Sequence, residues 1–351
     1  MMRRLATGLA ALAAAACSIS GLPDAEIPQA PIAIVNRTPE DSRQRAEALA
    51  DQEKDQAAQR GRPVESPGQA GQAGQTVARV KDVQRYLKSV VSPEAMQAIE
   101  RKFPGRLALL DPRTRKIETL AAAWGDAVPQ AWSADRSKLL FTALVDEFAQ
   151  LFEFDVGKGE MRPITHGPEA HPAGCHGPGG SYVMMTADVI DDEPLSRIEI
   201  LEPGSTRPRP LTSGPRDHSP TCASDGSVVV YVTEPSQGVQ WVMARDLRGD
   251  QAPRRLGPGS EPQFCGSSEW LVYTAPIQRG SKIWRMRADG TGRSPVGRGV
   301  LDETAPTCSP DGRLVAYNVV EGRVEILYVK RFDGSGDRIL YNDSSATHPV
   351  W

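Results

Sequence analysis

The chain has 351 residues, and its 41 lysines and arginines almost balance its 44 aspartates and glutamates, for a net charge of −3. No stripe of basic residues runs along it, which disfavours nucleic-acid binding. Its 32 glycines and 29 prolines fall mainly in short clusters between apolar runs, as a turn-rich β protein requires.

The first residues resemble a bacterial export signal. Two arginines precede an apolar run over residues 5–16, which is too short to span a membrane as a permanent helix. The run ends in the letters AAAC, which resemble a bacterial lipoprotein signal, although that family prefers leucine at the first of these alanines. The resemblance implies a signal peptide over residues 1–16, lipidation of Cys17, and sorting to the outer membrane because Ser18 follows. The alternative is a cleaved signal peptide and an unanchored periplasmic protein.

Residues 17–76 have little capacity to build a core. We expect a flexible lipid-anchored tether with a Gly- and Gln-rich linker and a polar helix that Thr38 caps and that runs to about Arg60. Residues 77–104 differ, because their apolar residues recur at helical spacing. They predict a helical lead-in that packs against the edge or floor of the folded domain.

Six positions then recur at an almost constant interval. The anchor positions are separated by 43, 47, 43, 43 and 43 residues, and they are Trp132, Cys175, Cys222, Cys265, Cys308 and Trp351. Most anchors open a phrase in which a turn signal precedes a β-rich run, as in CSPDGRLVAYNV from Cys308. A period in the forties with this pattern is typical of a β-propeller blade.

The blade after Cys308 illustrates the unit. A tight turn at Ser309-Pro310-Asp311-Gly312 is followed by strands predicted over residues 314–319, 325–332 and 338–341. Before Trp132, residues 106–111 and 116–121 match the third and fourth strands of a blade, and residues 346–351 match a first strand. We therefore predict an all-β fold, a six-bladed propeller over residues 105–351, in which the two ends of the chain share one blade and leave no open sheet edge.

These phrases resemble the repeats of the TolB-like family, also described as WD40-like or PD40 repeats. Residues 309–312 match the full Ser-Pro-Asp-Gly motif, and residues 222–226 and 133–135 match in part. The resemblance covers roughly residues 105–351 and implies a propeller fold. It also implies partners in the cell envelope, because TolB-like proteins bind peptidoglycan-associated lipoproteins and other envelope components.

The four cysteines at anchor positions admit two interpretations. An even set in an exported protein suggests disulfides. Equivalent positions on neighbouring blades are instead expected to point the same way round the ring, with Cα atoms beyond the bridging limit of about 7 Å. On this argument we expect small buried apolar residues between blades.

One set of polar residues suggests a metal site. The fourth residues before the anchors are Val128, His171, His218, Glu261, Thr304 and Thr347. His171, His218 and Glu261 come from three adjacent blades, and two imidazoles with a carboxylate near the axis suit a divalent cation, with His176 and His348 nearby. The alternative is that these side chains form hydrogen bonds in a wet channel, with no cofactor.

The sequence contains no recognisable nucleophile, Walker loop or H-E-x-x-H motif, so an enzyme is disfavoured. We expect an outer-membrane-anchored periplasmic lipoprotein that acts as a protein–protein interaction scaffold, with peptidoglycan-associated or outer-membrane proteins as partners. The alternative is a metal-dependent or carbohydrate-binding propeller that uses its central channel, as polysaccharide lyases of this repeat class do. A third alternative is a sensor or assembly factor for a motility or secretion complex, for which the same sequence features are expected as for the scaffold.

Overall fold

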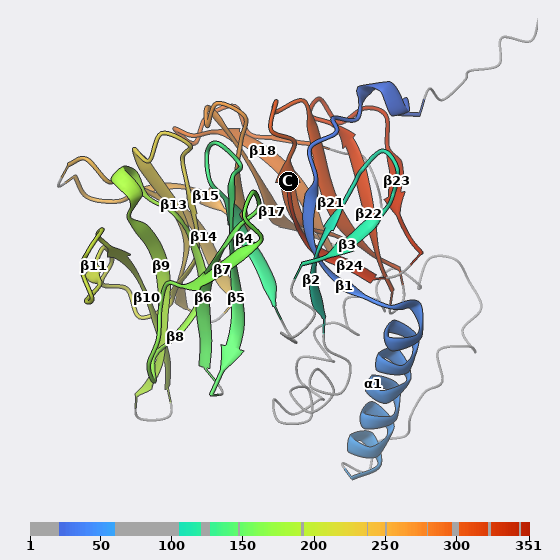
Figure 1. Ribbon diagram of the computed structural model, residues 1–351, viewed down its shortest axis with the longest axis horizontal. Helices are drawn as coiled ribbons and strands as arrows, with labels where there is room; N and C mark the ends of the chain where they lie inside the picture. Colours follow the sequence, from blue (N-terminus) through green and yellow to red (C-terminus); the bar gives the residue numbers. More distant parts are fainter. Residues whose placement is uncertain are drawn as a thin grey trace, which may run out of the picture.

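The computed structural model describes residues 21–59, 105–120, 127–146, 148–190, 193–236, 238–249, 251–278, 280–296, 302–321, 324–343 and 345–351. These residues form six four-stranded antiparallel sheets arranged around a central axis, as Figure 1 shows in ribbon form. The predicted six-bladed β-propeller is thus confirmed. The signal peptide, Cys17 and the helical lead-in over residues 77–104 lie outside the described residues. Within the described ranges, no helix is both long and apolar enough to cross a membrane.

Five blades are continuous in sequence, and we number them in chain order. Blade 1 contains β4 (Val128–Trp132), β5 (Lys138–Val145), β6 (Phe148–Asp155) and β7 (Glu160–Pro163). Blade 2 contains β8 (Ala170–His176), β9 (Tyr182–Ile190), β10 (Glu193–Leu201) and β11 (Arg209–Pro210). Blade 3 contains β12 (Asp217–Cys222), β13 (Val228–Ser236), β14 (Val239–Asp246) and β15 (Arg254–Pro258). Blade 4 contains β16 (Ser260–Cys265), β17 (Trp270–Ile277), β18 (Gly280–Arg287) and β19 (Ser294–Pro295). Blade 5 contains β20 (Asp302–Cys308), β21 (Leu314–Glu321), β22 (Val324–Arg331) and β23 (Arg338–Tyr341).

The turn that defines the repeat is held by its own side chains. In blade 5 the Ser309 hydroxyl accepts a hydrogen bond from the Leu314 amide at 2.9 Å and donates one to Asp311 at 2.6 Å. Gly312 closes the turn with a φ of 70°, a conformation that favours glycine. The same contacts recur in blade 1, where hydrogen bonds from the Ser133 hydroxyl and from Ser137 lower the pKa of Asp135 to about 2. Local hydrogen bonding therefore explains why this motif precedes the second strand in blades 1 and 5.

Blade 6 closes the ring, and its composition corrects the predicted domain boundary. Its strands are β24 (Ser345–Val350), β1 (Ile32–Arg37), β2 (Arg106–Leu110) and β3 (Ile117–Thr119), in that order. The first, third and fourth strands are those expected from the sequence, but the second comes from the segment predicted as a tether. Residues 32–35 are apolar and at most 3% exposed, so burial overrides the polar composition of the surrounding chain.

The chain leaves the ring between β1 and β2. The helix expected after Thr38 is present as α1 (Pro39–Gln59), and the Thr38 hydroxyl accepts a hydrogen bond from the Asp41 amide at 3.1 Å. Since β1 is the second strand and β2 the third, residues 38–105 are an insertion into a hairpin of blade 6. They do not connect the propeller to its N-terminus.

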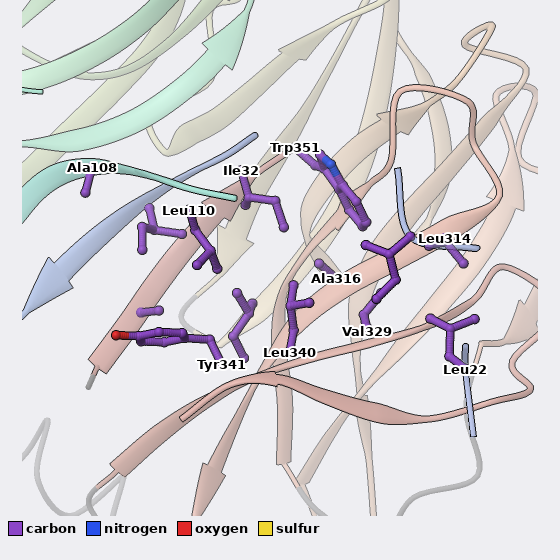
Figure 2. Packing of buried hydrophobic residues seen from close by; sticks show 14 residues of the cluster. Leu22, Ile32, Ala108, Leu110, Leu314, Ala316, Val329, Leu340, Tyr341 and Trp351 are labelled. Carbon is purple, nitrogen blue, oxygen red and sulfur yellow. The ribbon is translucent and has the colours of Figure 1, made fainter. Parts of the chain in front are cut away.

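The first described segment of the chain is bound to the propeller. We call residues 21–31 the strap; it includes the 3-10 helix η1 (Asp24–Glu26). Leu22 and Ile27 are 3% and 0% exposed, in a cluster with residues of blades 5 and 6 that Figure 2 shows from close by. The predicted tether is therefore wrong over this stretch, because the strap has apolar residues that bury themselves on the ring.

Two faces of the ring follow from the strand order. The turn face has the turns between first and second strands and between third and fourth strands, together with the strap. The hairpin face has the hairpins between second and third strands, and hence α1. Figure 1 shows η1, the short blue helix, and α1 at opposite ends of the molecule in the direction of the strands.

Candidate functional site at the channel mouth

A cavity of about 390 Å³ lies where the central channel opens on the turn face. Its walls come from the inner strands of all six blades and include five of the six anchor positions: Trp132, Cys175, Cys222, Cys308 and Trp351. Serines of the first turns, such as Ser133, Ser224 and Ser309, form the rim. The repeat therefore places its most regular residues around one opening, whose wall also contains polar side chains such as Thr221, Gln263 and Thr307.

The anchor cysteines form two disulfides, Cys175–Cys222 and Cys265–Cys308, with Cα–Cα distances of 5.7 and 5.1 Å. The prediction that these positions lie too far apart to pair is wrong. Neighbouring positions in a regular ring of six are as far from each other as each is from the axis, so residues close to the axis come within bridging distance. The even set of four anchor cysteines, in a chain whose first residues resemble an export signal, was the signal that could have identified these bonds.

The remaining two anchors are tryptophans, of which Trp132 joins blade 1 to blade 6 and Trp351 joins blade 6 to the strap. The Trp132 indole donates a hydrogen bond to the Val350 carbonyl at 3.1 Å, and the Trp351 indole donates one to the Ala30 carbonyl at 3.0 Å. The Arg136 guanidinium lies 4.5 Å from the centroid of the Trp132 ring, and burial lowers the pKa of Arg136 to about 10. Four of the six anchors thus form two covalent pairs, and the two tryptophans are held by hydrogen bonds to backbone carbonyls.

A buried carboxylate lies between blades 1 and 2, next to the channel mouth. Glu153 accepts hydrogen bonds from Tyr182 at 2.8 Å and Arg162 at 2.9 Å, forms an ion pair with Lys138 at 3.2 Å, and lies 3.4 Å from His176 Nε2. Burial alone would raise the pKa of Glu153, but the hydrogen bonds from Tyr182, Arg162 and Lys138 outweigh it and hold the pKa below its ordinary value. This carboxylate therefore stays charged.

His176 links that cluster to the cavity. Its side chain lines the channel mouth, its Nε2 faces Glu153, and burial lowers its pKa. Burial and Glu153 raise the pKa of Tyr182 to about 12. Sequence reasoning named His176 only as a neighbour of the metal site and missed Glu153. The signal was a glutamate at an inward position of an apolar strand, which requires a charged partner.

The three predicted metal ligands have other partners. His171 Nδ1 lies 3.3 Å from the Thr186 hydroxyl, which donates a hydrogen bond to Glu199. His218 Nδ1 lies 2.9 Å from the Ser219 hydroxyl. The Glu261 carboxylate accepts hydrogen bonds from Thr274 at 2.7 Å and from the Ala305 amide of the next blade at 2.8 Å. Burial lowers the pKa of both His171 and His218.

These contacts match the alternative in which the ring residues form hydrogen bonds. In the part of the chain that the structure describes, no three histidines, cysteines or carboxylates are grouped so as to hold a metal ion. His348 Nδ1 lies 3.1 Å from the neighbouring Thr347 hydroxyl. The metal site stays a prediction from the sequence.

The structure aligns the inner strands differently from the sequence analysis, which counted four residues back from each anchor. Each has a register shift where it pairs with the second strand, and each contains one residue directly before a proline. These residues are Val128, His171, Ser219, Glu261, Ala305 and His348. The last four have φ values between 48° and 52°. Blades 3, 5 and 6 have one residue fewer before the anchor, so the equivalent of Glu261 in blade 3 is Ser219 and not His218.

The hairpin face has a different character. Large apolar side chains at least 37% exposed occur at the tips of three of its hairpins, namely Leu144, Phe148, Val239 and Ile277. They belong to blades 1, 3 and 4, and the insertion with α1 starts on the same face in blade 6. Four of the seven large apolar side chains that are exposed among the described residues thus lie on this face, and exposed apolar surface is one property of protein-binding sites.

No family model and no curated protein matches the sequence. The fold is similar to that of TolB from Acinetobacter baumannii, with a TM-score of 0.58 and 17% identity over 70% of this chain and 62% of that one, less than two thirds of its length. A TolB-like protein from Agrobacterium tumefaciens matches with a TM-score of 0.54 and 19% identity over 66% of this chain and 86% of that one.

Hydrazine synthase from Kuenenia stuttgartiensis matches with a TM-score of 0.58 and 13% identity over 70% of this chain and 43% of that one. At these identities the likeness establishes a TolB-like propeller fold. Because the matched structures also include an enzyme subunit, the fold alone does not decide the function.

Proposed function

We propose that this protein is a periplasmic β-propeller, anchored to the outer membrane by lipidated Cys17, that acts as a protein–protein interaction scaffold in the cell envelope. The observation that carries this proposal is the hairpin face. Its exposed apolar side chains, Leu144, Phe148, Val239 and Ile277, lie where second and third strands meet in blades 1, 3 and 4. Loops held by a rigid scaffold are where binding residues concentrate.

The two disulfides support an exported protein. Disulfides persist in oxidising compartments such as the periplasm and are rare in the cytosol. Each bond joins the innermost strands of adjacent blades, so it limits movement of one blade against the next. A ring held in this way presents its hairpins in a constant arrangement, which lowers the entropy lost when a partner binds.

The partners that we propose are envelope proteins, such as peptidoglycan-associated proteins or outer-membrane complexes. The TolB-like fold supports this class. Apolar hairpin tips suit a protein surface better than a nucleic acid or a sugar, because protein interfaces have an apolar core within a polar rim.

Capture from native membranes tests the proposal. Cross-linked partners of the wild-type protein are identified, and their yields are compared with those of a Leu144→Asp, Phe148→Asp variant. The matched control is Val156→Asp, since Val156 is also exposed, at 39%, but lies on the turn face of the same blade. We expect the hairpin variant to lose a partner that the control retains. Equal yields from both variants would contradict the proposed surface.

A further inference from the structure

The path of the strap determines where an N-terminal anchor meets the propeller. The Leu22 carbonyl accepts a hydrogen bond at 3.1 Å from Arg338, which lies on β23, the outermost strand of blade 5. From there the strap crosses the turn face to blade 1, where the Pro31 carbonyl accepts a hydrogen bond from Arg136 at 2.8 Å. A lipid at Cys17 is therefore only five positions from a residue buried on the ring.

Ion pairs hold the beginning of the strap in place. Glu26 and Arg331 form two contacts of 2.7 Å, and Asp24 lies 2.6 Å from Arg338. The strap thus has both of its carboxylates paired with arginines of blade 5. Its negative charge is compensated on the surface that it crosses.

We infer that the turn face of blades 5 and 6 lies against the membrane and that the exposed turn between β2 and β3 binds anionic lipid headgroups there. The inference rests on the proposed lipid anchor at Cys17. Five residues span at most about 17 Å when fully extended. An anchor inserted in the bilayer therefore holds Leu22, and with it the outer edge of blade 5, next to the headgroups.

The turn beside the strap has the chemistry for this contact. Arg113, Arg115 and Lys116 are exposed, and the Arg113 guanidinium donates a hydrogen bond to the Ile27 carbonyl of the strap. Asp111 accepts hydrogen bonds from the amides of Arg113 and Thr114, both at 2.9 Å, which fixes the turn. Across the described ranges, neither Arg115 nor Lys116 takes part in an ion pair.

Two carboxylates on this part of the turn face have local partners. Asp311 forms an ion pair with Arg313 at 2.7 Å, and Asp333 accepts hydrogen bonds from the Ser335 amide and hydroxyl. The positive charges of Arg115 and Lys116 are therefore available to a surface. An anionic leaflet attracts each basic residue close to it by a factor of about five in affinity.

The same orientation leaves the hairpin face directed away from the membrane. The apolar tips Leu144, Phe148 and Val239 lie at the other end of the strands from the strap, since they are at the junctions of second and third strands. A scaffold held in this way would offer its proposed partner surface to the periplasm, while the channel mouth faces the membrane side.

Photo-cross-linking to lipid tests this orientation. The acylated protein is reconstituted in phosphatidylethanolamine vesicles with and without phosphatidylglycerol, with a benzophenone amino acid in place of Arg115 or, as the control, of Phe148. Metabolic labelling with a palmitate analogue, lost in Cys17→Ala, reports the anchor separately. We expect label on Cys17 and several-fold more lipid cross-linking from position 115 than from position 148.

The possible results separate the two proposals. Label on Cys17 with equal cross-linking from both positions, or with more from position 148, would overturn the orientation and leave the anchor intact. Absence of label would overturn the anchor and the orientation together.

A charge-reversal series tests the headgroup contact on its own. The unacylated Cys17→Ser chain is titrated with phosphatidylglycerol vesicles. We expect the additional substitutions Arg115→Glu and Lys116→Glu each to lower the affinity for these vesicles at least about fivefold. The matched control is Arg207→Glu, an exposed arginine between the third and fourth strands of blade 2, two blades away from blade 6. Equal weakening in the control, or no weakening in the double variant, would refute the role of this turn.

Discussion

Removing one interblade disulfide should measure how much the covalent pairing of anchors stabilises the ring. Cys265 and Cys308 are 43 residues apart in sequence, and their Cα atoms are 5.1 Å apart. Closing a loop of that length in the unfolded chain corresponds to about 4 kcal/mol of stabilisation by the chain-entropy relation. We therefore expect Cys265→Ala with Cys308→Ala to lower the free energy of unfolding by roughly 2–4 kcal/mol.

The assay is equilibrium unfolding in guanidinium chloride, with the oxidised wild-type protein as reference. Cys175→Ala with Cys222→Ala is the matched pair, because its loop of 47 residues predicts nearly the same loss. Peptide mapping without reductant identifies the bonded partners. Four free thiols in the purified protein, or unchanged stability in both double variants, would refute the reasoning and restore the expectation of unbonded cysteines.

Three further predictions concern β1 in blade 6, the buried pair of His176 and Glu153, and the metal site. Ile34→Asp should prevent ring closure or lower the unfolding free energy by more than about 4 kcal/mol, because it buries an unpaired carboxylate in a side chain position that is 0% exposed; Ile339→Asp, at an exposed position, should change the midpoint little. Burial lowers the pKa of His176 in the folded state, so the unfolded chain takes up its proton first and stability should fall as the pH drops below the ordinary value of 6.5. Glu153, whose folded pKa lies below 4.5, adds a second loss as the pH falls through that folded value. Denaturation midpoints measured across this pH range check both effects, and a first drop that persists in His176→Gln would contradict the assignment. Elemental analysis should find no stoichiometric zinc, manganese or iron in purified protein, whereas one equivalent that is lost in His171→Ala would establish the site that the sequence predicts.

The blade architecture was predictable because its determinants are local. The Ser309–Gly312 turn is stabilised by hydrogen bonds between residues at most five positions apart, so its sequence is sufficient to identify it. The alternation of turns with β-branched runs then gave the number of blades. Closure by the C-terminal strand followed from counting strands, since an incomplete blade at each end requires a partner.

The errors concern contacts between residues far apart in the sequence. Ile32–Arg37 pairs with Arg106–Leu110 across an insertion of 68 residues, and a short apolar run in a polar region does not reveal such a partner. Whether Cys175 reaches Cys222 depends on the distance of both residues from the axis, which no local pattern contains. No local pattern identifies the partners of Glu153 either, because its hydrogen-bond donors come from two blades.

The sequence by itself thus determined the repeat, its turns and the closed ring, because turn hydrogen bonds and strand propensity act within a few residues. Only the tertiary structure decided which cysteines pair, which segment supplies the second strand of blade 6 and where the N-terminus meets the ring. Those outcomes depend on how closely the inner strands converge on the axis and on which apolar segments the ring can bury.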